Sequence, residues 1–239
     1  MPPPDSDRLA QLLALLFQAH PWHGVTPAPA ADGALTGYIE IVATDTVKYE
    51  LDKPSGVLRV DRPNRFSSQC PTPYGFVPQS YCAEFIAERC MARTGLLGIV
   101  GDGDPLDLCI LTEKSFTHGS FLLRCRPIGG LRMIDSGEAD DKIIAVLEGD
   151  AVYGHLTDLT DAPDGVVDRL RHFFLTYKQG PAAVVATAGP DAHRSVEIAE
   201  IYGRDEAIAT INASYADYRR HFGEPSSRLA ELRQLLASG

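Results

Sequence analysis

The sequence lacks the long apolar run that a membrane-spanning helix needs. No segment approaches about 20 consecutive apolar residues. The N-terminus carries Asp5 and Asp7, where a signal peptide would be basic. We therefore expect a soluble, cytoplasmic protein that does not associate with membranes.

Basic residues are too few for a general nucleic-acid binder. The chain has 22 Lys and Arg against 32 Asp and Glu, which gives a formal net charge of −10. Such a charge repels a phosphate backbone unless basic residues are locally concentrated. We therefore expect no nucleic-acid partner.

The cysteines lack the paired short spacing of a secreted disulfide framework. Five occur, at Cys70, Cys82, Cys90, Cys109 and Cys125. Their odd number and irregular spacing favour a reducing compartment. Cys82 and Cys90 could form half of a zinc site, but no second pair accompanies them, so buried or loop thiols are the simpler interpretation.

The composition suits one sizeable domain of mainly β or mixed structure. The 239 residues are 44% hydrophobic and include 21 Gly and 17 Pro, too many for a helical bundle. Short β-branched or alternating segments, separated by turn residues, predict strands at Tyr38–Ala43, Val47–Asp52, Val57–Asp61, Leu106–Thr112, Phe121–Pro127 and Lys142–Leu147. Strands at this density predict a small closed barrel.

Apolar residues at helical spacing lie on both sides of this region. They predict an N-terminal helix and a Pro/Ala/Gly linker over residues 1–37, followed by a main domain over 38–239. The N-terminal helix would pack against the body or a neighbouring subunit. Further helices are expected from Val166 to Lys178, from Arg204 to His221 and, shorter, from Leu229 to Leu236.

Three carboxylates crowd together at the start of an apolar strand: Asp102, Asp104 and Asp107. Like charges this close stay ionised only if cations compensate them, and oxygen ligands select hard ions such as Mg²⁺, Mn²⁺ or Ca²⁺. An ordinary acidic turn with Asx hydrogen bonds is the alternative. An EF-hand loop is excluded, because its fifth and sixth positions, counted from Asp102, would be Leu106 and Asp107 instead of an oxygen ligand and glycine.

More charged groups occur beside the other predicted strands. A second acidic segment runs from Asp135 to Lys142, and Glu50 adds a carboxylate elsewhere. Basic or phenolic side chains stand at strand and helix ends, namely Lys48, Arg62, Lys142, Lys178, Tyr74 and Tyr177. Each basic residue alone could be a solvated surface group. Together they indicate several metal ions and a highly anionic ligand.

These segments resemble the soluble inorganic pyrophosphatases of the first structural type (family I). The resemblance spans roughly Tyr38 to Lys178 and keeps the family's order. It comprises Ile39-Glu40-Ile41, Lys48-Tyr49-Glu50, Val60-Asp61-Arg62, Tyr74-Gly75, the Asp102–Asp107 run, Asp135 with Asp140 and Lys142, and His172-Phe-Phe-x-x-Tyr177-Lys178.

The resemblance implies a five-stranded OB-like barrel with helices packed outside it (α+β). It also implies a homo-oligomer that hydrolyses inorganic diphosphate to two phosphates. The reaction would use water activated by several Mg²⁺ ions, with Mn²⁺ as a substitute, and no covalent intermediate.

The resemblance also implies roles for individual residues. Asp102, Asp107, Asp140, Asp135 and Glu50 correspond to metal ligands, Asp104 to the acceptor of a proton from the attacking water, and Glu40 to an acid behind the ligands. Lys48, Arg62, Lys142, Tyr177 and Lys178 correspond to phosphate ligands, and Tyr74 to a tyrosine near the metal-bound end of the substrate.

Two features depart from the family pattern. Cys70 stands where relatives often have an aromatic residue, and a segment of about residues 83–97 looks like an inserted surface excursion. Two other functions share parts of the pattern: an OB-barrel nucleic-acid binder without catalysis, and a metal-dependent hydrolase of nucleotides or other organic phosphates.

Overall fold

A computed structural model describes residues 18–27, 33–64, 67–178 and 196–224, together with 227, 230–232 and 234. The expected N-terminal helix and half of the expected Leu229–Leu236 helix lie outside these residues. The division of the chain after residue 37 and the assignment of 83–97 as an insertion stay predictions.

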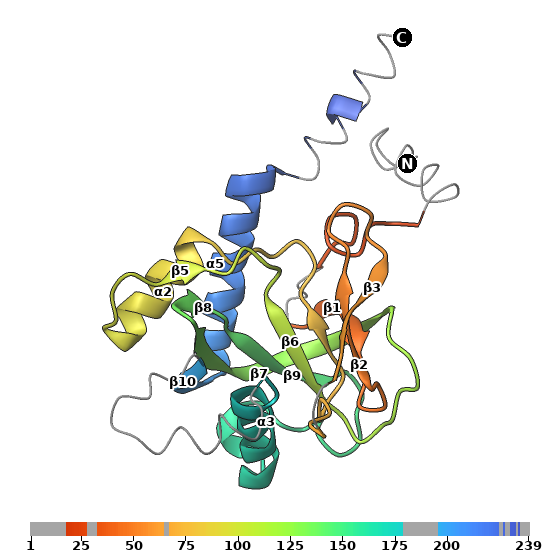
Figure 1. Cartoon of the computed structure of the whole chain (residues 1–239), viewed down its shortest axis with the longest axis vertical. Coiled ribbons are helices and arrows are strands. Elements are labelled where there is room, and N and C mark those ends of the chain that lie inside the picture. The colour runs from red at the N-terminus through yellow and green to blue at the C-terminus, as the bar shows by residue number, and fades with distance from the viewer. Residues whose placement is uncertain are drawn as a thin grey trace.

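Five strands close into a ring (Figure 1). They are β1 (Leu35–Ile41), β4 (Tyr74–Phe76), β6 (Asp107–Leu111), β9 (Lys142–Leu147) and β7 (Phe121–Asp135), in that order around the sheet. β7 pairs back onto β1, with Leu35 opposite Cys125 and Ile39 opposite Phe121. Only β6 and β9 run parallel; the other ring pairs are antiparallel. The predicted five-stranded barrel is confirmed.

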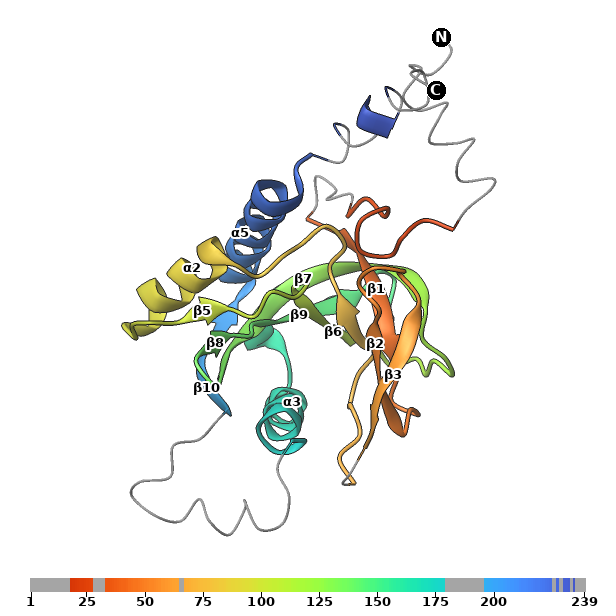
Figure 2. The same ribbon diagram turned by 45° about the horizontal axis from the view of Figure 1, so that its top comes forward.

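The second half of β7 extends beyond the ring and carries three more strands. β10 (Val196–Gly203) and β8 (Glu138–Ala139) both pair with β7, and β5 (Val100–Gly101) pairs parallel with β8. A separate two-stranded hairpin joins β2 (Val47–Leu51) to β3 (Leu58–Pro63). In Figures 1 and 2 this hairpin stands next to β1 at one side of the barrel.

Helices cover the barrel on opposite sides (Figure 2). α3 (Asp164–Thr176) buries Leu170 and Phe174, and α5 (Arg204–Phe222) buries Ala207 and Ile211 among its core residues. These two helices were predicted within two residues of their observed ends. A short 3₁₀ helix, η1, covers Leu159–Asp161.

The 83–97 segment contains a helix that the sequence did not predict. α2 (Glu84–Thr94) lies beside α5 and buries Ile86, Ala87 and Cys90. None of the described helices has the length and apolar character needed to cross a membrane.

The expected linker contributes side chains to the core. Trp22 is 2% exposed and donates its indole N–H to the Ser80 carbonyl at 2.7 Å. β1 also begins at Leu35, three residues before the predicted start. The linker interpretation is therefore wrong for Trp22, which packs in the core, and for Leu35–Gly37, which pair with β7.

All five cysteines are free and buried. Cys82 and Cys90 lie within the apolar core. Their surroundings support the thiol interpretation over a zinc site.

Candidate active site

A cavity of about 170 Å³ lies among β2, the β5–β6 loop and the end of α3. Its lining includes all the predicted site residues except Arg62: Glu40, Lys48, Glu50, Tyr74, Asp102, Asp104, Asp107, Asp135, Asp140, Lys142, Tyr177 and Lys178. Arg62 lines an adjoining cavity of about 350 Å³, which shares Lys48, Tyr74, Tyr177 and Lys178 with the first. The fold thus brings segments that are far apart in the sequence to one place.

Glycines shape the end of β5 and the β5–β6 loop. A Cβ on Gly101 would stand 2.4 Å from the Cys82 carbonyl oxygen, and Gly103 has a φ of +72°, which favours glycine. Asp102 Oδ1 accepts a hydrogen bond from the Asp104 amide at 2.9 Å. The Asx bond of the alternative interpretation is therefore present, and both carboxylates still line the cavity.

Asp107 and Lys142 face each other because β6 and β9 are parallel and begin side by side. The Lys142 ammonium donates hydrogen bonds to the carboxylates of Asp107 and Asp140. Lys142 is 2% exposed. Burial alone would lower its pKa, but the two carboxylates raise the pKa well above the ordinary lysine value. Lys142 therefore stays charged in the cavity wall.

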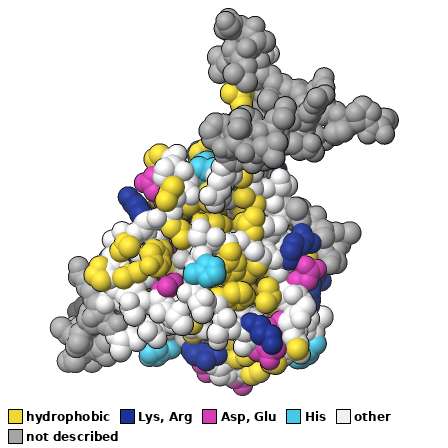
Figure 3. Space-filling view, turned by 90° about the vertical axis from the view of Figure 1, so that its right-hand side faces the viewer, with side chains coloured by type: hydrophobic (Ala, Val, Ile, Leu, Met, Phe, Trp, Pro, Cys, Tyr) yellow, Lys and Arg dark blue, Asp and Glu magenta, His cyan; other side chains and the backbone are white. Residues whose placement is uncertain are grey.

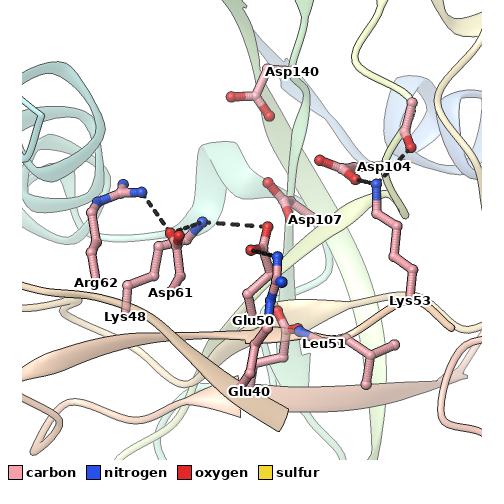
Figure 4. Close-up of polar contacts among 12 residues, drawn as sticks. Glu40, Lys48, Glu50, Leu51, Lys53, Asp61, Arg62, Asp104, Asp107 and Asp140 are labelled. Carbon is pink, nitrogen blue, oxygen red and sulfur yellow. Dashed lines mark hydrogen bonds and ion pairs between the residues drawn. The ribbon is translucent and has the colours of Figure 1, made fainter. Parts of the chain in front are cut away.

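The β2–β3 hairpin presents side chains of both signs to the cavity (Figure 4). Lys48 Nζ lies 3.2 Å from Asp61 Oδ2 and 3.8 Å from Glu50 Oε1. Asp61 Oδ2 also pairs with the Arg62 guanidinium at 2.6 Å. Asp61 therefore holds two of the predicted phosphate ligands together.

The end of α3 supplies the remaining predicted phosphate ligands. The Tyr177 ring stacks on Phe173 with 5.0 Å between ring centres, and the Lys178 ammonium forms an ion pair with Asp135. The Tyr74 ring lies 5.9 Å from that of Phe174. Burial, and next the Asp107 carboxylate, raise the pKa of Tyr74 well above its ordinary value, so its hydroxyl remains a donor.

Comparison with known proteins identifies the family. A family model described as inorganic pyrophosphatase matches residues 37–219. The chain belongs to the inorganic pyrophosphatase family.

Individual relatives agree with this membership. The inorganic pyrophosphatase of Chlamydia muridarum is 49% identical over 83% of this chain and 93% of its own length. The soluble inorganic pyrophosphatase of Oryza sativa is 38% identical over 82% of this chain and 78% of its own. Among solved structures, the inorganic pyrophosphatase of Thermus thermophilus matches with a TM-score of 0.65 at 28% identity, covering 83% of this chain and 99% of its own.

The donor set of this pyrophosphatase-family site fits divalent cations. Burial, and then the neighbouring Asp140 and Asp107 carboxylates, raise the pKa of Asp102 to about 9. Burial is also the main cause that raises the pKa of Asp107. In the part of the chain that the structure describes, no three His, Cys, Asp or Glu side chains are already arranged around one ion. Lysine ammonium groups pair with the carboxylates: Lys142 with Asp107 and Asp140, Lys53 with Asp104, and Lys178 with Asp135.

Glu40 lies in the cavity wall, almost fully buried, and connects two strands. Its Oε1 accepts a hydrogen bond from the Leu51 amide at 2.7 Å, so that β1 holds the end of β2. Burial raises the pKa of Glu40 from 4.5 to about 8. The side chain therefore fixes the hairpin that carries Lys48 and Glu50.

Lys53 is a site residue that sequence reasoning missed. Its ammonium pairs with the Asp104 carboxylate and donates to the Gly103 carbonyl at 3.1 Å (Figure 4). The residue follows β2 in the hairpin turn, and nothing in its local sequence distinguishes it from a surface lysine. Only the packing of the hairpin against the β5–β6 loop reveals the contact.

Proposed function

We propose that this chain is an inorganic diphosphatase that hydrolyses diphosphate to two phosphates. One observation carries the proposal: a single small cavity gathers the carboxylates of Asp102, Asp107 and Asp140 together with the side chains of Lys48, Lys53, Lys142 and Lys178. Diphosphate is small and highly anionic, so it needs cations on every side. Family membership supports the same activity.

We propose Mg²⁺ as the cofactor, with several ions bound and Mn²⁺ as a substitute. Oxygen-only ligands suit these hard ions. Asp102, Asp107 and Asp140 would hold the first ions, and Asp135 and Glu50 would contribute to further ones. Bound divalent ions would lower the pKa of water from 15.7 towards about 7 and absorb the charge of the leaving phosphate.

The chain's own residues would then bind and orient the substrate. Lys48, Arg62 and Lys178 are now paired with Asp61 or Asp135, and phosphate oxygens would compete for these donors. Tyr74 and Tyr177 would add phenolic donors. Asp104 would accept the proton of the attacking water, with Lys53 orienting its carboxylate. No side-chain nucleophile is required, so the phosphoryl group would pass directly to water.

We also propose a cytoplasmic homo-oligomer with no nucleic-acid or membrane partner. Large apolar side chains stand exposed, among them Leu97 at 90%, Val57 at 64% and Leu122 at 50%. Figure 3 shows one face on which apolar side chains gather and few basic ones appear. Such a face suits contact with other copies of the chain better than contact with a polyanion.

Phosphate release provides the test. The purified protein would be given diphosphate or ATP with Mg²⁺, Mn²⁺, Ca²⁺ or a chelator. We expect rapid release from diphosphate with Mg²⁺, less with Mn²⁺, none with the chelator, and much slower release from ATP. Preference for ATP would favour the organic-phosphate hydrolase, and no release from either would refute the proposal.

A further inference from the structure

A buried ionic cluster lies on the side of β7 that α2 and α5 cover. At its centre Arg132 is 0% exposed and contacts Glu200 Oε2 at 2.5 Å and Glu206 Oε1 at 2.6 Å. Its guanidinium carbon also lies 4.9 Å from the centre of the Tyr202 ring. A fully buried charge must keep its ionic partners, because losing one leaves an uncompensated charge in the interior. The segments that supply these partners are therefore held in one arrangement.

The cluster reaches the unpredicted helix α2. Arg89 binds Glu206 Oε2 at 2.5 Å, and Arg93 pairs with Glu200. The cluster, here called the Arg132 cluster, comprises Arg89, Arg93, Arg132, Asp141, Glu200 and Glu206, so its three positive charges balance three negative ones. Helix α2 therefore supplies two of the three balancing cations.

The inner end of the Arg132 cluster is Asp141, which lies between two site residues. Asp141 Oδ2 accepts a hydrogen bond from the Tyr202 hydroxyl at 3.2 Å and lies 3.5 Å from Arg132. Its neighbours Asp140 and Lys142 line the cavity. Successive side chains of an extended segment point to opposite sides, so one short segment faces the site with two side chains and the Arg132 cluster with the third.

We propose that Asp141, Arg132 and Tyr202 are positioning residues for the metal-binding carboxylate of Asp140. The proposal rests on the proposed function, since it concerns the same site. The backbone before the segment is fixed by the hydrogen bond from the Asp140 amide to the Met133 carbonyl at 2.9 Å. The contacts of the Asp141 side chain with Arg132 and Tyr202 keep the backbone of this segment from rotating about its axis. They thereby fix the direction in which the Asp140 carboxylate points.

A positioning role predicts weaker metal binding and intact chemistry. Groups that orient metal ligands typically contribute about 10–100-fold to metal affinity or activity. An Asp140 carboxylate that points in a less favourable direction can still bind Mg²⁺ when the ion concentration is high. Turnover should therefore recover when Mg²⁺ saturates the site. A purely structural role would lower stability without this selective change.

The test uses two conservative variants and two matched controls. Asp141→Asn keeps the shape but removes the charge, and Tyr202→Phe keeps the ring in the core but removes the hydroxyl. Asp168→Asn, on a carboxylate that is 67% exposed, and Tyr153→Phe, outside the site cavity, are the controls. Mg²⁺ binding to chelator-stripped protein is measured by titration calorimetry, and turnover of diphosphate is measured at saturating Mg²⁺.

We expect the dissociation constant for Mg²⁺ to rise about 10-fold in Asp141→Asn and by a smaller factor in Tyr202→Phe. The turnover of both variants at saturating Mg²⁺ should stay near that of the wild type. The two controls should match the wild type in Mg²⁺ affinity and in turnover. Folded variants that bind Mg²⁺ like the wild type would overturn the proposal. If Asp141→Asn fails to fold, Tyr202→Phe decides the question. A wild type that binds Mg²⁺ but leaves diphosphate intact would refute the proposed function, while the variants' Mg²⁺ affinities would still decide the positioning role.

Discussion

Lys142 donates a hydrogen bond to the Asp107 carboxylate across the parallel pair β6–β9. The same ammonium group bonds Asp140, so one buried cation compensates two anions. These two hydrogen bonds explain how the carboxylates of Asp107 and Asp140 can lie close together without a metal ion between them. We expect the balance to change when metal ions and an anionic substrate bind, with the ammonium then donating to phosphate oxygens.

Lys142→Met should destabilise the metal-free protein. Removing one partner of a buried ion pair leaves uncompensated charge and typically costs about 3–5 kcal/mol. Because Mg²⁺ can supply the missing positive charge, most of the loss should disappear when the ion is added. Urea unfolding with chelator and with Mg²⁺ measures both quantities.

The control for this prediction is Lys114→Met, on a side chain that is 66% exposed. It should change stability little under either condition. Equal destabilisation of Lys142→Met with and without Mg²⁺ would contradict the charge-compensation argument.

Asp107→Asn should lower turnover more than Lys178→Ala. In the proposed site Asp107 would contribute to the electrostatic arrangement around the ions, and loss of one such group typically costs about 100–1,000-fold. Lys178 would make one charged contact to phosphate, which is typically worth about 1.5–3 kcal/mol, or roughly 10–150-fold. Steady-state phosphate release at saturating Mg²⁺ ranks the two variants, with Asp168→Asn as the unaffected control. Equal turnover in Asp107→Asn and Lys178→Ala would contradict the view that the metal-site carboxylate contributes more than a single phosphate contact.

Glu40→Gln should flatten the pH dependence of stability. The pKa of Glu40 is raised from 4.5 to about 8 by burial, so between these values the folded chain keeps a proton that the unfolded chain releases. Its contribution to stability is complete below 4.5 and is lost as the pH rises through about 8. The loss is on the order of 4–5 kcal/mol over this window.

The glutamine keeps an oxygen that can accept from the Leu51 amide. Denaturant unfolding of the chelator-treated protein from pH 5 to 8 should therefore show a steeper decline in the wild type than in Glu40→Gln. Glu148→Gln, on a side chain that is 52% exposed, serves as the control. Parallel curves for the wild type and Glu40→Gln would show that Glu40 is ionised throughout.

Asp217→Ala should destabilise the protein by about 2–3 kcal/mol, and Asp217→Asn by about 1 kcal/mol. The Asp217 carboxylate on α5 accepts hydrogen bonds from the amides of Ala83, Phe85 and Ile86, at 3.0 to 3.1 Å. It thus caps α2, whose own N-cap residue Ala83 has no side-chain acceptor.

Hydrogen exchange locates the effect. The first-turn amides of α2 should lose protection in Asp217→Ala beyond the global change, whereas Asp168→Ala should leave them unchanged. Unaltered protection of those amides would mean that water satisfies them equally well.

The sequence was informative where local pattern decides structure. Four of the five ring strands, β1, β6, β7 and β9, alternate or are β-branched, and the apolar stripes of α3 and α5 follow helical spacing, so these elements could be predicted. The three-residue ring strand β4 is too short to carry such a pattern, and it was missed. The site residues lie in segments that are far apart in the sequence, and their spacing alone does not predict that they meet. They could be assigned to one site only because these segments resemble those of a known family. Their placement around one cavity agrees with that grouping, and their individual roles stay predictions.

The missed features depend on partners far along the chain. The N-terminus of α2 is capped by Asp217, which is 131 residues away from Ile86, so its sequence shows no cap of its own. Lys53 reaches Asp104 only through the packing of the hairpin. Arg132 is buried within an apolar strand, and its partners come from separate segments that no periodicity relates.

The most direct measurement is an anomalous difference map from crystals of the protein soaked with Mn²⁺. The account predicts peaks in bonding contact with the carboxylates of Asp102, Asp107 and Asp140, with the Lys142 ammonium displaced from at least one of them. Mn²⁺ that binds elsewhere, while these three carboxylates keep their contacts with lysine, would contradict it.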